Sequence, residues 1–142
     1  GRSDWNLMKE LVEFIDKRIP VFGSGDLFSP EDAKRMMEQT GVDAVMFARG
    51  AMGNPFIFRD ATSLFKNGSY EPVPAEVRIK TGFEELERLV KDTNEQHACL
   101  EMRKRFHAYS KGIPGGAALR SRIVQASTVA DYHDIFDDFL NH

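Results

Sequence analysis

The sequence predicts a small α/β unit followed by an all-α unit. Over residues 1–70, apolar segments alternate in the order helix, strand, helix, strand, helix, and a glycine-bearing loop follows each strand. After the stiff stretch Pro72-Val-Pro74, every apolar pattern has helical spacing. Alternating strands and helices are typical of a parallel sheet with right-handed crossovers and helices on both faces. We therefore expect two domains, residues 1–70 and residues 71–142.

The α/β half opens with a predicted helix over Asp4–Lys17, where Asp4 can accept hydrogen bonds from the free amides of the first turn. Its apolar residues repeat with helical spacing at Trp5, Met8, Leu11, Val12 and Ile15. The short apolar run Ile19–Phe22 follows and predicts a buried strand. The next residues, Gly23–Asp26, predict a tight loop.

A second helix is predicted to begin at Ser29 and to end near Gly41. Ser29 can cap this helix, Pro30 suits its first turn, and Asp32 stands where a capping box needs an acidic residue. Gly41 provides the left-handed residue that commonly ends a helix. The apolar run Val42–Phe47 then predicts another buried strand.

The third predicted helix runs from Pro55 to about Phe65, with Asn54 as its cap, after the glycine-bearing loop Ala48–Gly53. Four further helices are expected beyond the linker. Their apolar positions are, in order, Ile79, Phe83, Leu86, Leu89 and Val90; Met102, Phe106 and Tyr109; Leu119, Ile123 and Ala126; and Tyr132, Ile135, Phe136 and Phe139. The run Thr128–Asp131 has the pattern of a capping box for the last helix. This half therefore predicts a small helical bundle.

Composition argues against several classes of protein. No apolar run approaches the roughly 18 residues of a membrane span, and the first residues do not resemble a signal peptide. The single cysteine, Cys99, cannot form an internal disulfide and favours a reducing, cytoplasmic location. We interpret Cys99 as a small helix residue rather than as a nucleophile. We expect no membrane partner and no metal site.

One region is basic on an otherwise acidic chain. The net charge is -3, yet no Asp or Glu occurs from Met102 to Ala130. Six basic side chains lie in this region, Arg103, Lys104, Arg105, Lys111, Arg120 and Arg122, and His107 lies among them as a further candidate for RNA contact. Such a region is either a solvated helix face or a surface that binds nucleic-acid phosphates. The absence of acidic residues and the aromatic residues among the basic ones favour the second interpretation.

The loops that follow the two strands are candidates for a phosphate site. Each leads into a capped helix, whose first amides are unpaired and attract anions. The first loop contains Ser24, Gly25 and Asp26, and the second contains Ala48 and Arg49. Glycines suit any tight turn, so the first loop alone is weak evidence. The guanidinium in the second loop makes phosphate binding the better interpretation.

An eight-stranded α/β barrel commonly binds phosphate between the loops after its last two strands, which matches this pair of loops. A complete barrel needs about 250 residues and eight strands, whereas the sequence predicts only two strands. We therefore expect a fragment that contains the last strand–helix units of a TIM (β/α)8 barrel and a helical bundle. Its unpaired strand edges would allow self-association between copies.

Two long stretches have the pattern of a known enzyme family. The stretch DWNLMKELVEFIDKRIPVFGSGDLFSPEDAKRMMEQTGVDAVMFARGAMGNPFIF resembles the end of the barrel of tRNA-dihydrouridine synthases. The stretch LEMRKRFHAYSKGIPGGAALRSRI resembles the signature of their C-terminal helical domain. The resemblance spans practically the whole chain but only the last part of a typical member. Family members usually have Asn where Ser24 stands, whereas Ala48-Arg49-Gly50 fits their second phosphate loop.

The resemblance implies reduction of the C5–C6 double bond of specific uridines in tRNA, with FMN as cofactor and NADPH as reductant. It implies that FMN is bound by Ser24, Gly25, Asp26, Ala48 and Arg49, and that the helical domain binds tRNA. The family's catalytic cysteine, and the lysine and histidine that approach flavin and substrate, lie before the first residue of this chain. We therefore expect no catalytic residue here and no activity from these residues alone.

Simpler interpretations exist for the same residues. Arg49 could be a surface ion-pair partner, Asp26 could serve only the turn and the helix dipole, and Trp5 is interpreted as packing. Two other functions also fit the pattern: an RNA-binding helical module on a non-catalytic α/β scaffold, and a fragment of another FMN barrel oxidoreductase. The basic helical appendage argues against a small-molecule oxidoreductase. Helix spacing places Arg103 near the bundle core and leaves a stripe of Lys104, His107 and Lys111 free.

Overall fold

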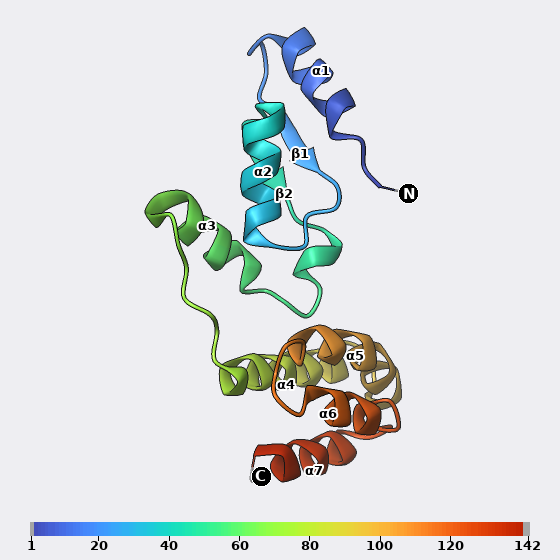
Figure 1. The fold of residues 1–142 in the computed structure, drawn as a ribbon. Helices are drawn as coiled ribbons and strands as arrows, with labels where there is room; N and C mark the ends of the chain where they lie inside the picture. The colour runs from blue at the N-terminus through green and yellow to red at the C-terminus, as the bar shows by residue number, and fades with distance from the viewer. Residues whose placement is uncertain (1, 141–142) are drawn as a thin grey trace. The chain divides into compact units, whose positions relative to one another are not determined.

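The computed structural model describes residues 2–140 and divides into two compact units, residues 1–72 and 73–142 (Figure 1). The first unit contains α1 (Trp5–Ile15), β1 (Phe22–Ser24), α2 (Pro30–Thr40), β2 (Ala44–Met46), the 3-10 helix η1 (Arg49–Ala51) and α3 (Ile57–Asn67). The second contains α4 (Ala75–Asp92), α5 (Glu95–Tyr109), α6 (Gly116–Ile123) and α7 (Val129–Leu140). The predicted order of helices and strands is confirmed.

The two strands β1 and β2 form a parallel sheet, as the alternation of elements predicted. The paired residues are Phe22 with Ala44, Gly23 with Val45, and Ser24 with Met46. Because successive side chains of a strand point to opposite faces, Gly23 and Val45 share one face of the sheet. Both strands are shorter than predicted, and β1 begins at Phe22, where the predicted strand ended.

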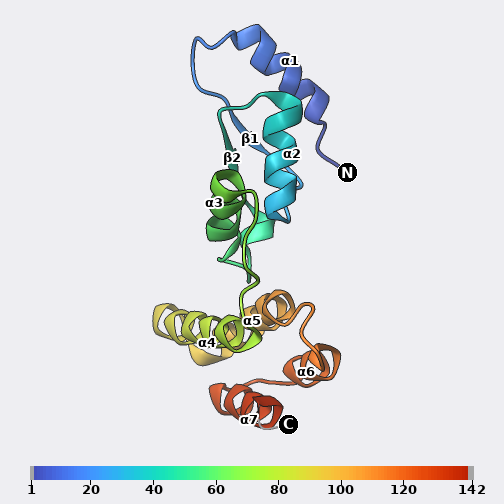
Figure 2. The ribbon, with the colours of Figure 1, turned by 60° about the vertical axis from the view of Figure 1, so that its left-hand side comes forward.

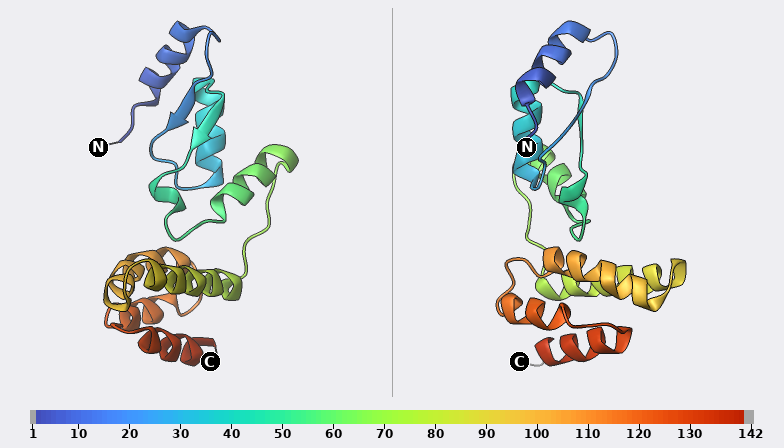
Figure 3. Two further views of the ribbon diagram at one scale, coloured as in Figure 1. Left: turned by 180° about the vertical axis from the view of Figure 1, so that it is seen from behind. Right: turned by 90° about the vertical axis from the view of Figure 1, so that its right-hand side faces the viewer.

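Helices cover only one face of this sheet. Gly23 is buried on the covered face, where a Cβ atom would lie 2.6 Å from Met36 Sδ and 2.9 Å from Met8 Sδ. On the opposite face, Phe22 is 66% exposed and Met46 is 57% exposed. Figure 3 shows the strands in front of α2, with their near face uncovered, when the first unit is seen from behind. The alternation of elements predicted two covered faces, and this holds for one face only, because no helix among residues 2–72 lies on the other. An uncovered face agrees with the expectation that these two strands are part of a larger barrel.

The core of the first unit lies between α1, α2 and the sheet. Leu27, Met36 and Val42 are buried at its centre. The partly buried residues packed around them are Trp5, Met8, Val12, Val21, Met37, Val45 and Phe47. The opposite side of α1 is an exposed apolar stripe formed by Leu7, Leu11 and Phe14. α1 therefore has one face in the core and a second apolar face in solvent.

The predicted caps are present at α1 and α2 but not at α3. The side chains of Asp4 and Ser29 accept backbone hydrogen bonds in the first turns of α1 and α2. α3 begins at Ile57 rather than at Pro55, and its N-cap residue Phe56 makes no capping hydrogen bond with its side chain. The prediction of a helix that starts at Pro55 is therefore wrong by two residues.

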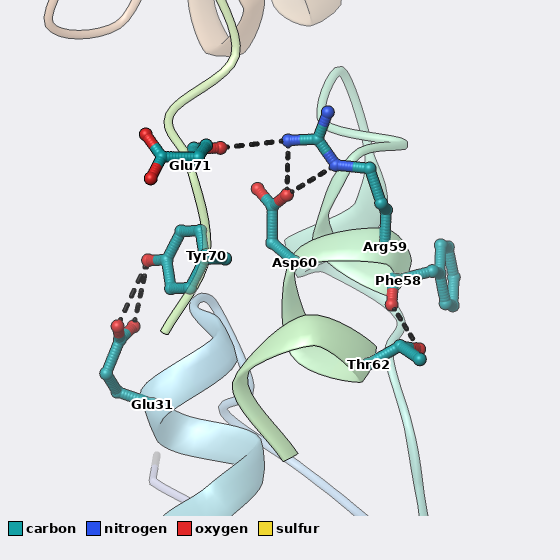
Figure 4. Close-up of polar contacts among 7 residues, drawn as sticks. All are labelled: Glu31, Phe58, Arg59, Asp60, Thr62, Tyr70 and Glu71. Atoms are coloured by element: carbon teal, nitrogen blue, oxygen red, sulfur yellow. Dashed lines mark hydrogen bonds and ion pairs between the residues drawn. The ribbon is translucent and has the colours of Figure 1, made fainter. Parts of the chain in front are cut away.

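The residues that follow α3 are bonded back onto the first unit (Figure 4). The Tyr70 hydroxyl donates to the Glu31 carboxylate at 3.0 Å, and burial together with this carboxylate raises the pKa of Tyr70. The Arg59 guanidinium donates to the Glu71 carbonyl oxygen at 3.1 Å and to the buried Asp60 carboxylate at 2.8 Å. These bonds hold the chain to this unit through Glu71.

The second unit is a helical bundle in which α4 packs on α5 and α6 packs on α7 (Figure 2). Its largest buried side chains are Ile79, Leu86, Cys99, Met102, Phe106, Tyr109, Leu119, Ile123, Tyr132 and Phe136. Cys99 is a buried residue of α5, as interpreted from the sequence. The predicted capping box is confirmed, because Asp131 N donates to Thr128 Oγ1 and Thr128 N donates to the Asp131 carboxylate. Ala126, expected in the third helix of this half, is buried but lies beyond the end of α6.

Candidate functional site

The two loops predicted to bind phosphate meet at one small pocket of the first unit. The pocket has a volume of about 120 Å³ and is lined by Ser24, Gly25, Asp26, Leu27, Phe28, Met46, Ala48, Arg49 and Gly50. Every residue that the sequence predicted to bind the cofactor lies on its wall. The fold brings them together because the carboxyl ends of adjacent parallel strands lie at the same edge of a sheet.

Close backbone contact joins the two loops. A Cβ atom on Gly50 would overlap the Leu27 carbonyl oxygen and lie 3.0 Å from Phe28 Cα, so only glycine lets η1 approach the first loop this closely. The Ser24 hydroxyl donates to the Met46 carbonyl oxygen at 3.1 Å and links the ends of the strands. The hydroxyl proton of Ser24 is therefore used within the sheet.

Arg49 contacts two residues of the first loop. Its Nη2 donates to Asp26 Oδ1 at 3.3 Å, and its guanidinium carbon lies 5.5 Å from the centre of the Phe28 ring. The Arg49 side chain is 72% exposed. The ion pair suggested by the simpler interpretation is thus present, but among residues 2–140 it uses one of the five N–H donors of the guanidinium. The remaining donors are available to an anion at the mouth of the pocket.

Asp26 bonds to protein groups with both of its carboxylate oxygens. Oδ1 accepts from Arg49, and Oδ2 accepts from the backbone amide of Ser3 at 2.6 Å. The backbone of Asp26 is left-handed, with a φ of 56°. An ionised carboxylate only accepts hydrogen bonds and repels a phosphate, so this side chain is suited to holding Arg49 and Ser3 rather than an anion.

Gly25 is required by the chain segment that crosses the first loop. Its φ is +121°, and a Cβ atom there would lie 2.6 Å from the Cβ atom of Ser3. The Trp5 indole donates to the Gly25 carbonyl oxygen at 3.2 Å, in addition to its packing in the core. A larger residue at position 25 would displace this segment, whatever its effect on a ligand.

Sequence reasoning missed three residues of this site. Ser3 and Trp5 reach the loop through tertiary contacts. Ser3 bonds to Asp26, 23 positions later, and Trp5 bonds to Gly25, 20 positions later. Phe28 carries no motif and is 53% exposed. A neighbouring pocket of about 440 Å³ shares Asp26 and Phe28 and is otherwise lined by Arg2, Ser3, Trp5, Asp32 and Arg35.

Several basic residues predicted to bind RNA are engaged within the second unit. Arg103 donates twice to the Ala126 carbonyl oxygen, at 3.1 and 2.7 Å. Arg105 pairs with Glu85 on α4, and the Glu85 hydrogen bond and charge raise the pKa of Arg105 against the opposing effect of burial. Arg120 donates to a backbone carbonyl, that of Ser110, at 3.3 Å. These three arginines therefore have roles within the bundle.

The other basic residues are exposed. Lys104 and His107 of α5, and Lys111 just beyond it, have exposed side chains that make no hydrogen bond or ion pair with residues 2–140. This arrangement agrees with the stripe that helix spacing placed away from the core. Arg122 is exposed and pairs with Asp138 at 2.8 Å.

Residues 2–140 contain neither a membrane-spanning helix nor a cluster of metal-ligating side chains. Their helices are too short or too polar to cross a membrane. In the same residues, no three His, Cys, Asp or Glu side chains lie close enough together to hold a metal ion. The two candidate functional sites are the pocket between the strand-end loops and the exposed basic stripe of Lys104, His107 and Lys111 on the helical unit.

Comparison with known proteins identifies the family. The sequence profile of the dihydrouridine synthase (Dus) family matches residues 1–142. The chain belongs to the dihydrouridine synthase family. It is 45% identical over 140 residues to a probable tRNA-dihydrouridine synthase of Treponema pallidum, an alignment that covers 97% of this chain and 41% of the relative.

Other dihydrouridine synthases match in the same way. A probable tRNA-dihydrouridine synthase 1 of Synechocystis is 31% identical over 141 residues, which cover 99% of this chain and 39% of the relative. The tRNA-dihydrouridine synthase B of Pseudomonas aeruginosa is 34% identical over 123 residues, which cover 86% of this chain and 36% of the relative. The chain thus spans about two-fifths of the length of the curated dihydrouridine synthases it matches. The family resemblance is confirmed, whereas the residues that bind cofactor or RNA stay predictions.

Proposed function

We propose that this chain is the C-terminal portion of an FMN-dependent tRNA-dihydrouridine synthase, and that the complete protein reduces specific uridines of tRNA to 5,6-dihydrouridine. The observation that carries the proposal is the convergence of two strand-end loops on one pocket with Arg49 at its wall. The names of the relatives, tRNA-dihydrouridine synthases, supply the substrate class. In this proposal the first unit is the end of a TIM barrel and the second is a tRNA-binding domain.

The residues around the pocket fit the phosphate end of FMN. A volume of about 120 Å³ accommodates a phosphate group, whereas pockets for whole drug-sized ligands hold about 300–1,000 Å³. Arg49 supplies a charged group with further N–H donors, and Gly25 and Ala48 line the same pocket. We propose that these residues hold the phosphate while the flavin ring lies against other parts of the complete protein.

When bound, FMN supplies hydride transfer to the C5–C6 double bond of uridine, with NADPH as the reductant. The residues of this chain contribute binding and orientation. Arg49 neutralises phosphate charge at the strand ends and so fixes one end of the cofactor. The pocket wall carries one carboxylate, Asp26, and it is engaged with Arg49 and Ser3, so the proton donor of the reaction is assigned to another part of the complete protein.

For the helical unit we propose contact with the tRNA backbone through Lys104, His107 and Lys111. These side chains are exposed and unpaired within residues 2–140, so phosphate contacts need not displace existing bonds. The same stripe supports the alternative function, an RNA-binding module on a non-catalytic scaffold.

One experiment separates the two functions. The complete protein is incubated with unmodified tRNA, FMN and NADPH, and dihydrouridine is measured by mass spectrometry of the digested RNA. We expect dihydrouridine to form only when both cofactors are present, and we expect none from residues 1–142 alone. Binding of tRNA by the complete protein without any reduction would support the non-catalytic module and contradict the proposed enzyme.

A further inference from the structure

We propose that Phe28 and Asp26 are positioning residues that hold the Arg49 guanidinium over the pocket. This inference rests on the proposed function, in which Arg49 binds the cofactor phosphate. It assigns Asp26 an action on Arg49 in place of direct cofactor contact, and it adds Phe28, which no sequence motif indicated.

Arg49 contacts a carboxylate and an aromatic ring of the first loop. Asp26 Oδ1 accepts from Nη2 at 3.3 Å, and the Phe28 ring centre lies 5.5 Å from the guanidinium carbon. A cation beside an aromatic face is attracted by the ring quadrupole. Together the carboxylate and the ring restrain a side chain that is otherwise 72% exposed.

Asp26 and Phe28 each make a further hydrogen bond within the first unit. The Asp26 carboxylate also accepts from the backbone amide of Ser3 at 2.6 Å. The backbone amide of Phe28 donates to Asp32 Oδ2 at 3.0 Å, at the start of α2. Each residue that contacts Arg49 is therefore itself hydrogen-bonded to another part of the first unit, Asp26 through its carboxylate and Phe28 through its backbone amide.

The exposure of Phe28 supports a role on the surface. Its side chain is 53% exposed, so the ring gains little from burial in the core. The ring lines the pocket together with Arg49. An arginine that is already oriented loses less side-chain freedom when it binds an anion, and this lowers the cost of binding.

The test is the FMN affinity of the complete protein, measured by quenching of flavin fluorescence. Phe28 is varied both in the wild-type protein and in a protein that carries Arg49→Ala. Phe28→Leu removes the ring but keeps an apolar side chain, and Phe28→Tyr keeps the ring. We expect Phe28→Leu to raise the Kd for FMN about two- to fivefold, the fold-change that corresponds to an exposed cation–π contact. We expect the Phe28→Tyr variant to have the wild-type Kd for FMN. In a protein that already carries Arg49→Ala, we expect Phe28→Leu to leave the Kd unchanged.

Asp26→Asn gives a second, charge-based arm of the same test. A positioning role predicts weaker FMN binding in the wild-type background and less than a twofold change in the Arg49→Ala background. Equal weakening in both backgrounds would show that Asp26 acts directly on the cofactor or on the loop as a whole. Tighter binding would show that its charge opposes the phosphate. Either result overturns the positioning role of Asp26.

The outcomes also separate this inference from the proposed function. If Arg49→Ala weakens FMN binding but Phe28→Leu does not, the phosphate site stands and the positioning role of Phe28 is overturned. If Arg49→Ala leaves FMN binding unchanged, the proposed phosphate site itself is overturned. Thermal unfolding of each variant shows whether the loops remain folded. Because Phe28 is exposed, its variants are expected to melt within a few degrees of the wild type.

Discussion

Gly82 of α4 lies directly against the Phe106 ring of α5. A Cβ atom at position 82 would overlap this ring and lie 3.0 Å from Tyr109 Cδ2. Both aromatic side chains are buried, and protein interiors are close-packed, so a shift of either ring is costly. The glycine therefore sets how closely α4 and α5 approach each other.

Gly82→Ala is expected to lower the free energy of unfolding of the helical unit. Helix propensity alone would raise stability by about 1 kcal/mol, but overpacking of a buried ring costs about 1–3 kcal/mol. We expect a net loss of up to about 2 kcal/mol in urea unfolding. Lys80→Ala on the exposed side of α4 is the control and should stay within about 0.5 kcal/mol of the wild type. A more stable Gly82→Ala variant would contradict this packing.

Acid should remove the stabilising contribution of Asp131. Hydrogen bonds from the backbone amides of Ser127 and Thr128 lower its pKa below the usual 3.8. A carboxyl whose folded pKa is depressed stabilises the fold fully above its unfolded pKa and loses this contribution as pH falls through the folded pKa. The stability difference between wild type and Asp131→Asn should therefore be constant from pH 7 to about pH 5 and shrink below about pH 4. A difference that stays constant in acid would show that these bonds do not depend on the charge.

Salt dependence of tRNA binding tests the basic stripe. Arg103, Arg105 and Arg120 are engaged within the bundle, so two to three phosphate contacts are expected from the exposed residues. Each neutralised phosphate contributes about 0.7–0.9 to the log–log slope, which predicts roughly -1.4 to -2.7. The double variant Lys104→Ala, Lys111→Ala should flatten this slope by more than one unit.

The control for the basic stripe is the double variant Lys80→Ala, Lys91→Ala, which removes two exposed lysines of α4. Its slope should equal that of the wild type. Circular dichroism is the check that both double variants are folded. An unchanged slope for a folded Lys104→Ala, Lys111→Ala variant would place the tRNA contacts elsewhere.

The uncovered face of the sheet should be buried in the complete protein. Phe22 and Met46 are both more than half exposed, and the matched relatives are more than twice as long as this chain. If further barrel strands cover this face, a thiol introduced by Met46→Cys should react slowly with a maleimide in the complete protein and quickly in residues 1–142. The buried Cys99 gives the background rate in both. Equal, fast labelling in both proteins would contradict a barrel around these strands.

The order of elements could be predicted because apolar spacing, glycine loops and capping residues are local signals. Strand burial could not be predicted, since it depends on which neighbours cover each face of the sheet. Ile19 and Phe22 form an apolar run, but both are exposed, while Gly23 is buried because Met36 and Met8 leave no room for a side chain. Burial in this sheet is set by the partners and not by the hydrophobicity of the strand.

The site was predictable to the extent that it lies at strand ends. Position after a strand identified both loops, and the pocket gathers their predicted residues. The supports of Arg49 were not predictable, because Phe28 has no motif and the Asp26–Ser3 bond joins residues 23 positions apart. For the basic region, the sequence could not tell which charged side chains are free to bind a partner. Counting charges identified it, but only the fold shows that Arg103 and Arg105 bond within the bundle.

The most direct test of the phosphate site compares FMN with riboflavin, which lacks the phosphate, in the complete protein and its Arg49→Ala variant. The control is Arg88→Ala, which removes an exposed arginine of α4 that does not line the pocket. We predict that Arg49→Ala weakens FMN binding by about 1.5–3 kcal/mol, the scale of a charge-assisted hydrogen bond, and leaves riboflavin binding unchanged. Unchanged FMN affinity, or an equal loss for FMN and riboflavin, would contradict a phosphate site at these loops.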